Sequence, residues 1–125
     1  MDDECPHKGK TGLRRIWNAL GYSMDGFANA FCHESAFRQE VVLAAVLIPL
    51  SVYVPTSGVG HAMLVGSILL VILVELLNSA IEATVDRISL ENHHLAKRAK
   101  DFGSAAVLVS LINTATTWAL ILVLH

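Results

Sequence analysis

The chain has 125 residues, of which 54% are hydrophobic and only 16% are charged, and its formal net charge is −2. Its mean hydropathy of +0.54 argues against a soluble domain, because a chain of this length cannot bury so much apolar surface within itself. The charge gives no indication of nucleic-acid binding. Composition therefore predicts a small membrane protein with a single domain.

Residues 11–33 are expected to form an amphipathic helix, because their apolar residues recur at steps of three and four. This apolar stripe consists of Leu13, Ile16, Trp17, Leu20, Met24, Phe27 and Phe31. Arg14 and Arg15 lie on the other face, and Gly21 and Gly26 are expected to bend or break the helix. A basic helix of this kind beside a membrane span is typical of one that lies in the membrane interface, although a helix that binds a soluble partner has the same pattern.

Three apolar stretches follow, and we expect them to span the membrane at about residues 35–55, 62–86 and 101–124. A bilayer core of roughly 30 Å requires about 20 helical residues. The uncharged part of the first stretch covers only about 21 Å, so that span must begin near Ser35. Pro49 within it predicts a kink.

The distribution of cations predicts the orientation of these spans. All nine Lys and Arg residues lie within residues 8–38 and 87–100. By the positive-inside rule, the N-terminus and the link at residues 86–101 should be cytoplasmic. The turn at residues 55–61 and the C-terminus should then face the other side of the membrane.

The second span carries a polar stripe of Glu75, Asn78, Glu82 and Asp86, which step by three, four and four residues and therefore share one helical face. Counted from the outer end of this span, Glu75 lies about 20 Å deep and Glu82 about 30 Å deep. Burying an ionised carboxylate at the depth of Glu75 costs several kcal/mol unless it is paired, hydrated or protonated. An intramembrane carboxylate is therefore a candidate for function.

A purely structural interpretation competes with the functional one. Asp86 has Arg87 and Arg38 as possible ion-pair partners that would fix helix packing. Glu75 has no cation in its own span, which favours function for this residue. The adjacent His93 and His94 should point to different faces of a helix, so a zinc pair is not expected.

Charged groups from all three spans converge on the cytoplasmic interface. Glu34 and Glu40 flank the inner end of the first span, and Lys100 and Asp101 begin the third. Mg²⁺ is typically bound by one or two carboxylates together with phosphate oxygens, and a lysine can neutralise a phosphoryl group in transfer. A buried glutamate such as Glu75 could then take the proton of a hydroxyl held in the lipid phase.

Three motifs in this order, FRQE at 37–40, VELLNSAIEATVDRIS at 74–89 and RAKDFGSAAVL at 98–108, resemble the prokaryotic integral-membrane diacylglycerol kinase family. The resemblance covers the chain from about Arg14 to the end of the third span. It implies a homotrimer of three-span protomers, each with an N-terminal surface helix, in the bacterial cytoplasmic (inner) membrane. It also implies transfer of the γ-phosphate of MgATP to diacylglycerol, which gives phosphatidic acid, in active sites shared between neighbouring protomers.

The resemblance further implies roles for individual residues. Glu75 matches the general base, and Glu34 and Glu82 match the ligands of Mg²⁺. The positions that match the ATP site are Arg15, Tyr22, Glu34, Asn78, Glu82, Glu91, His93, Lys100 and Asp101. Those that match the lipid site are Arg15, Arg38, Glu40, Glu75, Ser104 and Trp118.

The chain departs from the family pattern at a few positions. His33 stands where asparagine is common, and Ser89 and Lys97 replace glycines of the inner loop, so contacts of that loop with the nucleotide are open. Residues 1–10 have no counterpart in the motifs and are expected to be a disordered tail. Residues 11–125 are expected to be a single membrane domain.

Other functions remain to be distinguished. A relative of this family phosphorylates undecaprenol, and the long basic surface helix and Trp118 favour diacylglycerol without excluding that acceptor. A small proton- or cation-coupled transporter would use Glu75 as its translocation site, but transporters place such sites near the midplane. A structural membrane subunit would have no need for five clustered acids.

Overall fold

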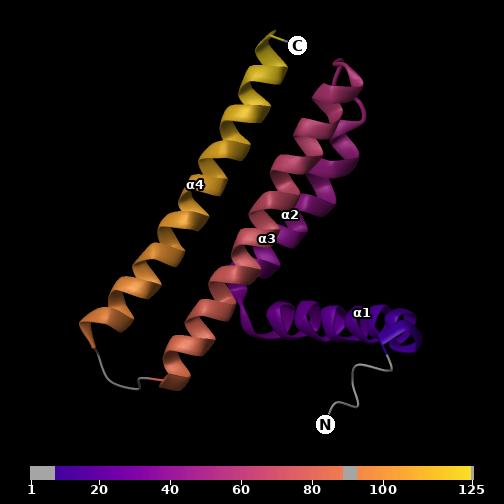
Figure 1. Ribbon diagram of the computed structural model, residues 1–125. Coiled ribbons are helices and arrows are strands. Elements are labelled where there is room, and N and C mark those ends of the chain that lie inside the picture. Colours follow the sequence, from indigo (N-terminus) through magenta and orange to yellow (C-terminus); the bar gives the residue numbers. More distant parts are fainter. Residues whose placement is uncertain (1–7, 89–92, 125) are drawn as a thin grey trace.

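The computed structural model describes residues 8–88 and 93–124, and the side chains from residue 12 onward. It contains four helices, α1 (Lys8–His33), α2 (Ser35–Ser51), α3 (Gly58–Ile88) and α4 (His94–Leu124) (Figure 1). No strand occurs in the described part of the chain. The all-α architecture predicted from the sequence is confirmed.

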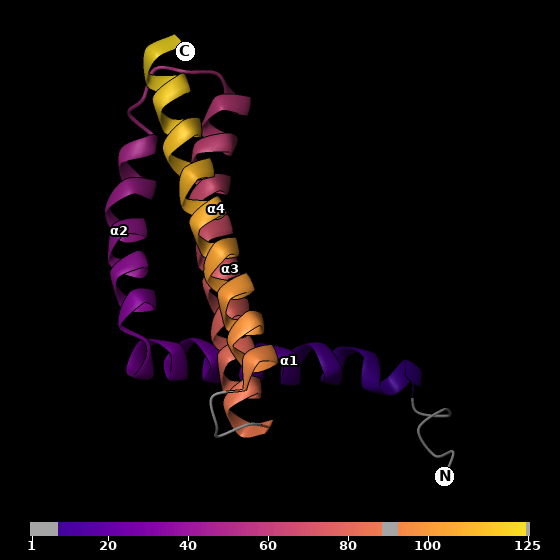
Figure 2. The same ribbon diagram turned by 90° about the vertical axis from the view of Figure 1, so that its left-hand side faces the viewer.

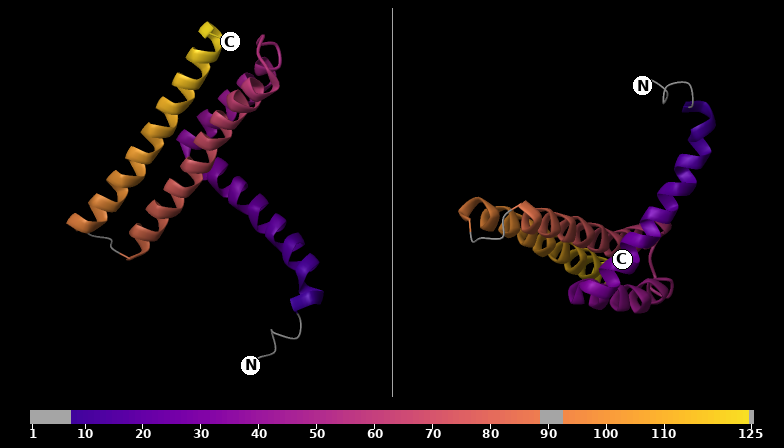
Figure 3. Two further views of the ribbon diagram at one scale, coloured as in Figure 1. Left: turned by 45° about the horizontal axis from the view of Figure 1, so that its top comes forward. Right: turned by 90° about the horizontal axis from the view of Figure 1, so that it is seen from below.

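Helix α1 lies across the end of the bundle formed by α2, α3 and α4 and projects away from it (Figures 1 and 3). It begins at Lys8, three residues before the predicted start, and runs through Gly21 and Gly26 without a break. Of the two outcomes expected at these glycines, a break does not occur, and residues 8–10 of the expected tail belong to the helix. The rest of the expected tail, residues 1–7, lies outside the described residues.

A sharp corner joins α1 to α2. Only Glu34 separates the two helices, and its φ of −117° and ψ of 110° are those of extended backbone. The guanidinium of Arg38 donates hydrogen bonds to the carbonyl oxygens of Phe31 at 2.7 Å and Cys32 at 3.2 Å. These carbonyls end α1 without helical partners, so Arg38 caps the helix and stabilises the corner.

Helix α2 ends at Ser51, four residues before the predicted end of the first span. Pro49 lies in its last turn, and the chain leaves the helix directly afterwards. Helix α3 begins four residues before the predicted second span because the hydroxyl of Ser57 accepts a hydrogen bond from the backbone N–H of Gly60 at 3.0 Å. A serine at this position is a strong N-cap.

The two long helices extend into the predicted link at residues 86–101. Helix α3 continues to Ile88, and α4 begins at His94. His93 caps α4, because its Nδ1 accepts a hydrogen bond from the backbone N–H of Leu95 at 3.0 Å. Its ring also stacks on that of His94, with centroids 4.6 Å apart. The two rings were expected to diverge, but a capping residue lies outside the helix and does not follow helical geometry.

The core of the bundle lies along α3, which packs beside both α2 and α4 (Figure 2). Leu64, Ile68 and Val71 of α3 are buried there. The hydroxyl of Thr114 on α4 donates to the carbonyl oxygen of Ser67 at 3.0 Å, which joins the two helices. Most other large apolar side chains of the three helices point outward and are exposed in the single chain. Such a surface requires lipid or further protein around it.

Two of the described helices, α3 and α4, are long and apolar enough to cross a membrane. Helix α2 has 17 residues, a length of about 26 Å at 1.5 Å per residue. The apolar stripe of α1 is also exposed, with Trp17 at 75%. These properties are consistent with an all-α membrane protein.

Candidate active site

A polar cleft lies where the beginning of α2 meets the inner halves of α3 and α4. Its volume is about 260 Å³. The residues that line it are Glu34, Ser35, Ala36, Glu75, Asn78, Glu82, Ser104 and Val107. Three carboxylates from two parts of the chain therefore face one small space.

The helical spacing of α3 and the α1–α2 corner together produce this arrangement. Glu75, Asn78 and Glu82 follow each other at steps of three and four, which keeps them on the face that looks toward α4. Glu34 reaches the same cleft because it is the corner residue. Glu75 is 4% exposed and Asn78 8%, whereas Glu34 and Glu82 are half-buried. The cleft thus has a dry end and a wetter end.

Glu40 of α2 approaches Glu75 closely enough for the two carboxyl groups to interact. One oxygen of Glu40, Oε1, is buried and has no hydrogen-bond partner among the described residues. Glu40 also lines a small apolar cavity of about 60 Å³ with Leu47 of α2, Val71 of α3 and Thr114 of α4. Glu75, at the dry end of the cleft, therefore has a second carboxyl group, that of Glu40, beside it.

Two ion pairs lie at the other, exposed end. The ammonium of Lys100 is 2.6 Å from Oδ1 of Asp86, across the two long helices, and Lys97 is 2.8 Å from Asp101 within α4. The hydrogen bond to Asp86 raises the pKa of Lys100 above its usual value. Arg87 and Arg38 were possible ion-pair partners of Asp86, but the structure pairs it with Lys100. Arg38 instead caps α1.

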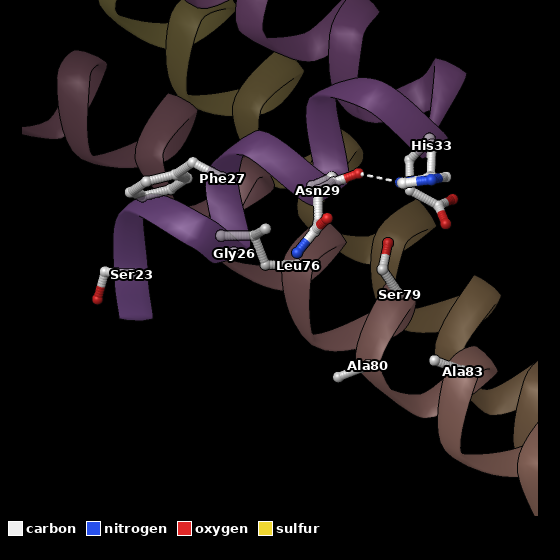
Figure 4. Close-up of a pocket in the computed structure, with 11 residues that line it drawn as sticks. Ser23, Gly26, Phe27, Asn29, His33, Leu76, Ser79, Ala80 and Ala83 are labelled. Carbon is white, nitrogen blue, oxygen red and sulfur yellow. Dashed lines mark hydrogen bonds between the residues drawn. The ribbon is translucent and has the colours of Figure 1, made fainter. Parts of the chain in front are cut away.

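A larger cavity of about 490 Å³ lies on another side of α3, beneath α1 (Figure 4). Its walls are mostly apolar or small, with Phe27 and Gly26 from α1 and Leu76, Ala80 and Ala83 from α3. Ser23 lies at one end of the cavity, and its other polar residues gather at the opposite end, where Ser79 of α3 points toward the end of α1 (Figure 4). They are Asn29, His33, Glu34 and Ser79. Glu34 lines both the polar cleft and this larger cavity, so these two spaces are neighbours.

Only one ring nitrogen of His33, Nδ1, has a hydrogen-bond partner in the part of the chain that the structure describes. Nδ1 lies 2.9 Å from the carbonyl oxygen of Asn29, one helical turn earlier. Because a carbonyl oxygen accepts, Nδ1 carries the proton in this contact and Nε2 is the acceptor of the neutral ring. The hydroxyl of Ser79 is buried and has no hydrogen-bond partner within residues 8–88 and 93–124.

Comparisons with known proteins identify the family. The family model described as prokaryotic diacylglycerol kinase matches residues 21–122. A diacylglycerol kinase of Pseudomonas aeruginosa is 56% identical over 117 residues, which are 94% of this chain and 95% of that protein. The diacylglycerol kinases of Escherichia coli K12 and Haemophilus influenzae are each 45% identical, over 92% and 90% of this chain and 94% and 95% of their own lengths.

The chain belongs to the prokaryotic diacylglycerol kinase family. The resemblance that the three motifs indicated is thereby confirmed. The prediction of a lipid kinase is confirmed with it, because the similar proteins are named diacylglycerol kinase and match this chain over nearly their whole length. Membership and the apolar helices together identify a membrane protein of a bacterial family.

The fold brings some of the residues matched to diacylglycerol kinases into the cleft and leaves others elsewhere. Glu34, Glu75, Asn78, Glu82 and Ser104 line the cleft. Lys100 and Asp101 lie on the first turns of α4 near its exposed end.

The other matched residues lie outside the cleft. Arg15 and Tyr22 are exposed on α1 and line neither cavity. Trp118 lies 14 residues beyond Ser104 on α4, about 21 Å along the helix. Glu91 is outside the described residues.

Two features of the site were not found from the sequence. Gly103 of α4 packs against the side chain of Asn78, and the cavity beneath α1 brings Asn29, His33 and Ser79 together. The small residues of the GSAAV segment were a signal for close helix packing. No sequence pattern showed which residue of α3 they would face.

Proposed function

We propose that this chain phosphorylates diacylglycerol with MgATP at the cytoplasmic interface of a bacterial inner membrane. The observation that carries the proposal is the cleft in which the nearly buried Glu75 lies with Glu34, Glu82 and Asn78. Its dry end suits a lipid hydroxyl and its wetter end suits a polyphosphate. An enzyme that joins a membrane-bound acceptor to a soluble donor requires both environments in one place.

Glu75 is the general base of the proposed reaction. Its carboxylate takes the proton of the lipid hydroxyl as the hydroxyl oxygen forms a bond to the γ-phosphorus. The bond from that phosphorus to the β–γ bridging oxygen breaks, and ADP leaves with the electron pair. Glu75 then returns its proton to water in the cleft. The low exposure of Glu75 supports this role, because a dry carboxylate is a stronger base than a hydrated one.

Glu34 and Glu82 are the residues that would hold Mg²⁺. The donor set fits the ion, since Mg²⁺ usually takes one or two carboxylates and completes its shell with phosphate oxygens and water. Within residues 8–88 and 93–124, no three His, Cys, Asp or Glu side chains form a ready metal site, so the remaining ligands would come from ATP and water. When bound, the ion would neutralise charge on the transferring phosphoryl group.

Lys100, Asp101 and Asn78 are proposed to contact the phosphates of ATP. Lys100 now contacts Asp86, so it would exchange a carboxylate for a phosphate when the nucleotide binds. Arg15, Tyr22, Glu91 and His93 complete the ATP site in the proposal. Arg15 and Tyr22 line neither cavity of their own chain, which favours an active site completed by a neighbouring protomer.

The lipid would lie along the bundle from the dry end of the cleft. Ser104 lines the cleft beside Glu75, and Arg38 and Glu40 lie at the beginning of α2. These residues, with Arg15, would surround the glycerol part of the acceptor. Trp118, about 21 Å farther along α4, would contact an acyl chain instead.

The proposed assembly is a homotrimer of three-span protomers with a cytoplasmic N-terminus, a single membrane domain over residues 11–125, and α1 in the membrane interface. The lengths of α3 and α4 support the proposal, as does the crosswise direction of α1 (Figure 1). The outward-facing apolar side chains need either lipid or neighbouring protomers.

Purified protein should transfer phosphate from ATP to diacylglycerol and produce phosphatidic acid. Diacylglycerol and undecaprenol are offered separately in mixed micelles, and the lipid product and ADP are measured. Phosphorylation of undecaprenol alone would identify the other acceptor. If neither lipid is phosphorylated, the proposal fails, and proton or cation flux in liposomes without ATP hydrolysis would favour a transporter.

Replacing Asp86 by asparagine is expected to lower the KM for ATP by about two- to fivefold, because Lys100 no longer has a competing carboxylate. The KM is measured at a fixed, saturating Mg²⁺ concentration. Asp25→Asn is the control, since it removes an exposed acid of α1 that lines neither cavity. A higher KM in the Asp86 variant would contradict the exchange and show that Asp86 itself supports nucleotide binding.

A further inference from the structure

Gly103 of α4 packs directly against Asn78 in the polar stripe of α3. It is one of only two buried residues of α4 among those described. A Cβ atom placed on Gly103 would overlap with Oδ1 of Asn78 and lie 3.1 Å from its Cγ. No larger residue fits at this position while the side chain of Asn78 stays where it is.

Asn78 is held in this position by shape and not by a strong hydrogen bond. Its Oδ1 is buried and has no hydrogen-bond partner in the described part of the chain. A buried amide oxygen without a partner costs free energy. The position of this side chain therefore depends on the space that Gly103 leaves.

We propose that Gly103 is a positioning residue that holds Asn78 in the orientation needed for phosphate binding. The inference rests on the function proposed above, in which Asn78 contacts the phosphates of ATP. The oxygen end of the amide lies against Gly103, so the NH₂ end is the one that the cleft can use. An NH₂ group donates hydrogen bonds, which suits a phosphate oxygen and does not suit a metal ion.

The orientation of Asn78 matters because this residue lies between the proposed base and a proposed metal ligand. Asn78 follows Glu75 by three residues and precedes Glu82 by four, and all three line the cleft. A side chain pushed away from Gly103 would move within the cleft itself. Nucleotide binding and phosphoryl transfer would both be weakened, although the helices would keep their positions.

Replacing Gly103 by alanine is expected to lower kcat/KM for ATP by about 10- to 100-fold, the loss expected for one hydrogen bond to a charged group. Helix propensity cannot cause such a loss, because alanine is the better helix former. Gly66→Ala is the matched control on α3, since nothing lies within 4 Å of a Cβ placed there. Gly60→Ala is the control for overlap alone, because its Cβ would meet the side chain of Thr56 at the other end of the molecule.

A double-mutant cycle with Asn78→Ala tests whether the loss passes through Asn78. Once the amide is removed, the added methyl group has nothing to displace, so Gly103→Ala is expected to cost less than about twofold in the Asn78→Ala background. Retention of the full loss in that background would overturn the proposal. Thermal unfolding and oligomer size are compared across all variants, because a general packing defect would lower both.

The side-chain amide resonance of Asn78 provides a test that does not depend on catalysis. In protein labelled with ¹⁵N, this resonance should shift in Gly103→Ala and stay in place in Gly66→Ala. An unchanged resonance in Gly103→Ala would overturn the positioning role even if activity fell. If the wild-type protein phosphorylated no lipid, the proposed function would fail, while the resonance would still report whether Gly103 controls the orientation of Asn78.

Discussion

Replacing Glu75 by glutamine is expected to lower turnover by about 10²- to 10⁴-fold, the usual contribution of a general base. Glutamine has the same shape as glutamate but accepts no proton at neutral pH. Because Glu75 is only 4% exposed, water cannot easily replace its carboxylate at the lipid hydroxyl. The variant should still fold and assemble, since glutamine fills the same volume without a buried charge.

The measurement compares initial rates of phosphatidic acid formation at saturating ATP and diacylglycerol, with oligomer size recorded for each preparation. Glu75→Asp should keep partial activity, because it retains a carboxylate but withdraws it by one methylene group. Ser67→Ala is the control for a polar change in the buried face of α3, because its hydroxyl is bonded within the helix to the carbonyl oxygen of Leu64. Full activity of Glu75→Gln would remove this residue as the base.

The helices of this fold follow mainly from local patterns, which explains why the sequence predicted them well. The starts of α2 and of the surface helix were predicted within three residues. The errors lie at helix ends, where Ser57 and His93 add capping hydrogen bonds. A histidine cap is uncommon, so composition gave no signal for it. Two glycines in α1 also failed to interrupt it, because a glycine weakens a helix without ending it.

The candidate site was predictable only in part. Some of its residues come together through their spacing along one helix, and others through contacts between helices. The spacing of Glu75, Asn78 and Glu82 places them on one face of any helix, and the structure keeps them there. Contacts between helices depend on rotation and register, which the sequence does not contain. The sequence therefore predicted neither the ion pair between Asp86 and Lys100 nor the packing of Gly103 on Asn78.

Replacing Glu82 by glutamine is expected to raise the Mg²⁺ concentration needed for half-maximal activity by about 10- to 100-fold. The amide keeps the size of the side chain but binds a divalent cation far less strongly than a carboxylate does. The measurement titrates total Mg²⁺ at a fixed ATP concentration. Asp25→Asn removes an equal charge from an exposed part of α1 and should leave the titration unchanged.

Glu34→Gln should change the Mg²⁺ titration in the same way, although Glu34 comes from the α1–α2 corner and Glu82 from α3. If both carboxylates hold one ion, the first substitution already removes most of the site, and the double variant should cost less than the product of the two single effects. Effects that multiply would indicate independent roles. An unchanged titration in either single variant would count against that residue as a ligand and leave the other carboxylate to bind Mg²⁺ with the phosphates alone.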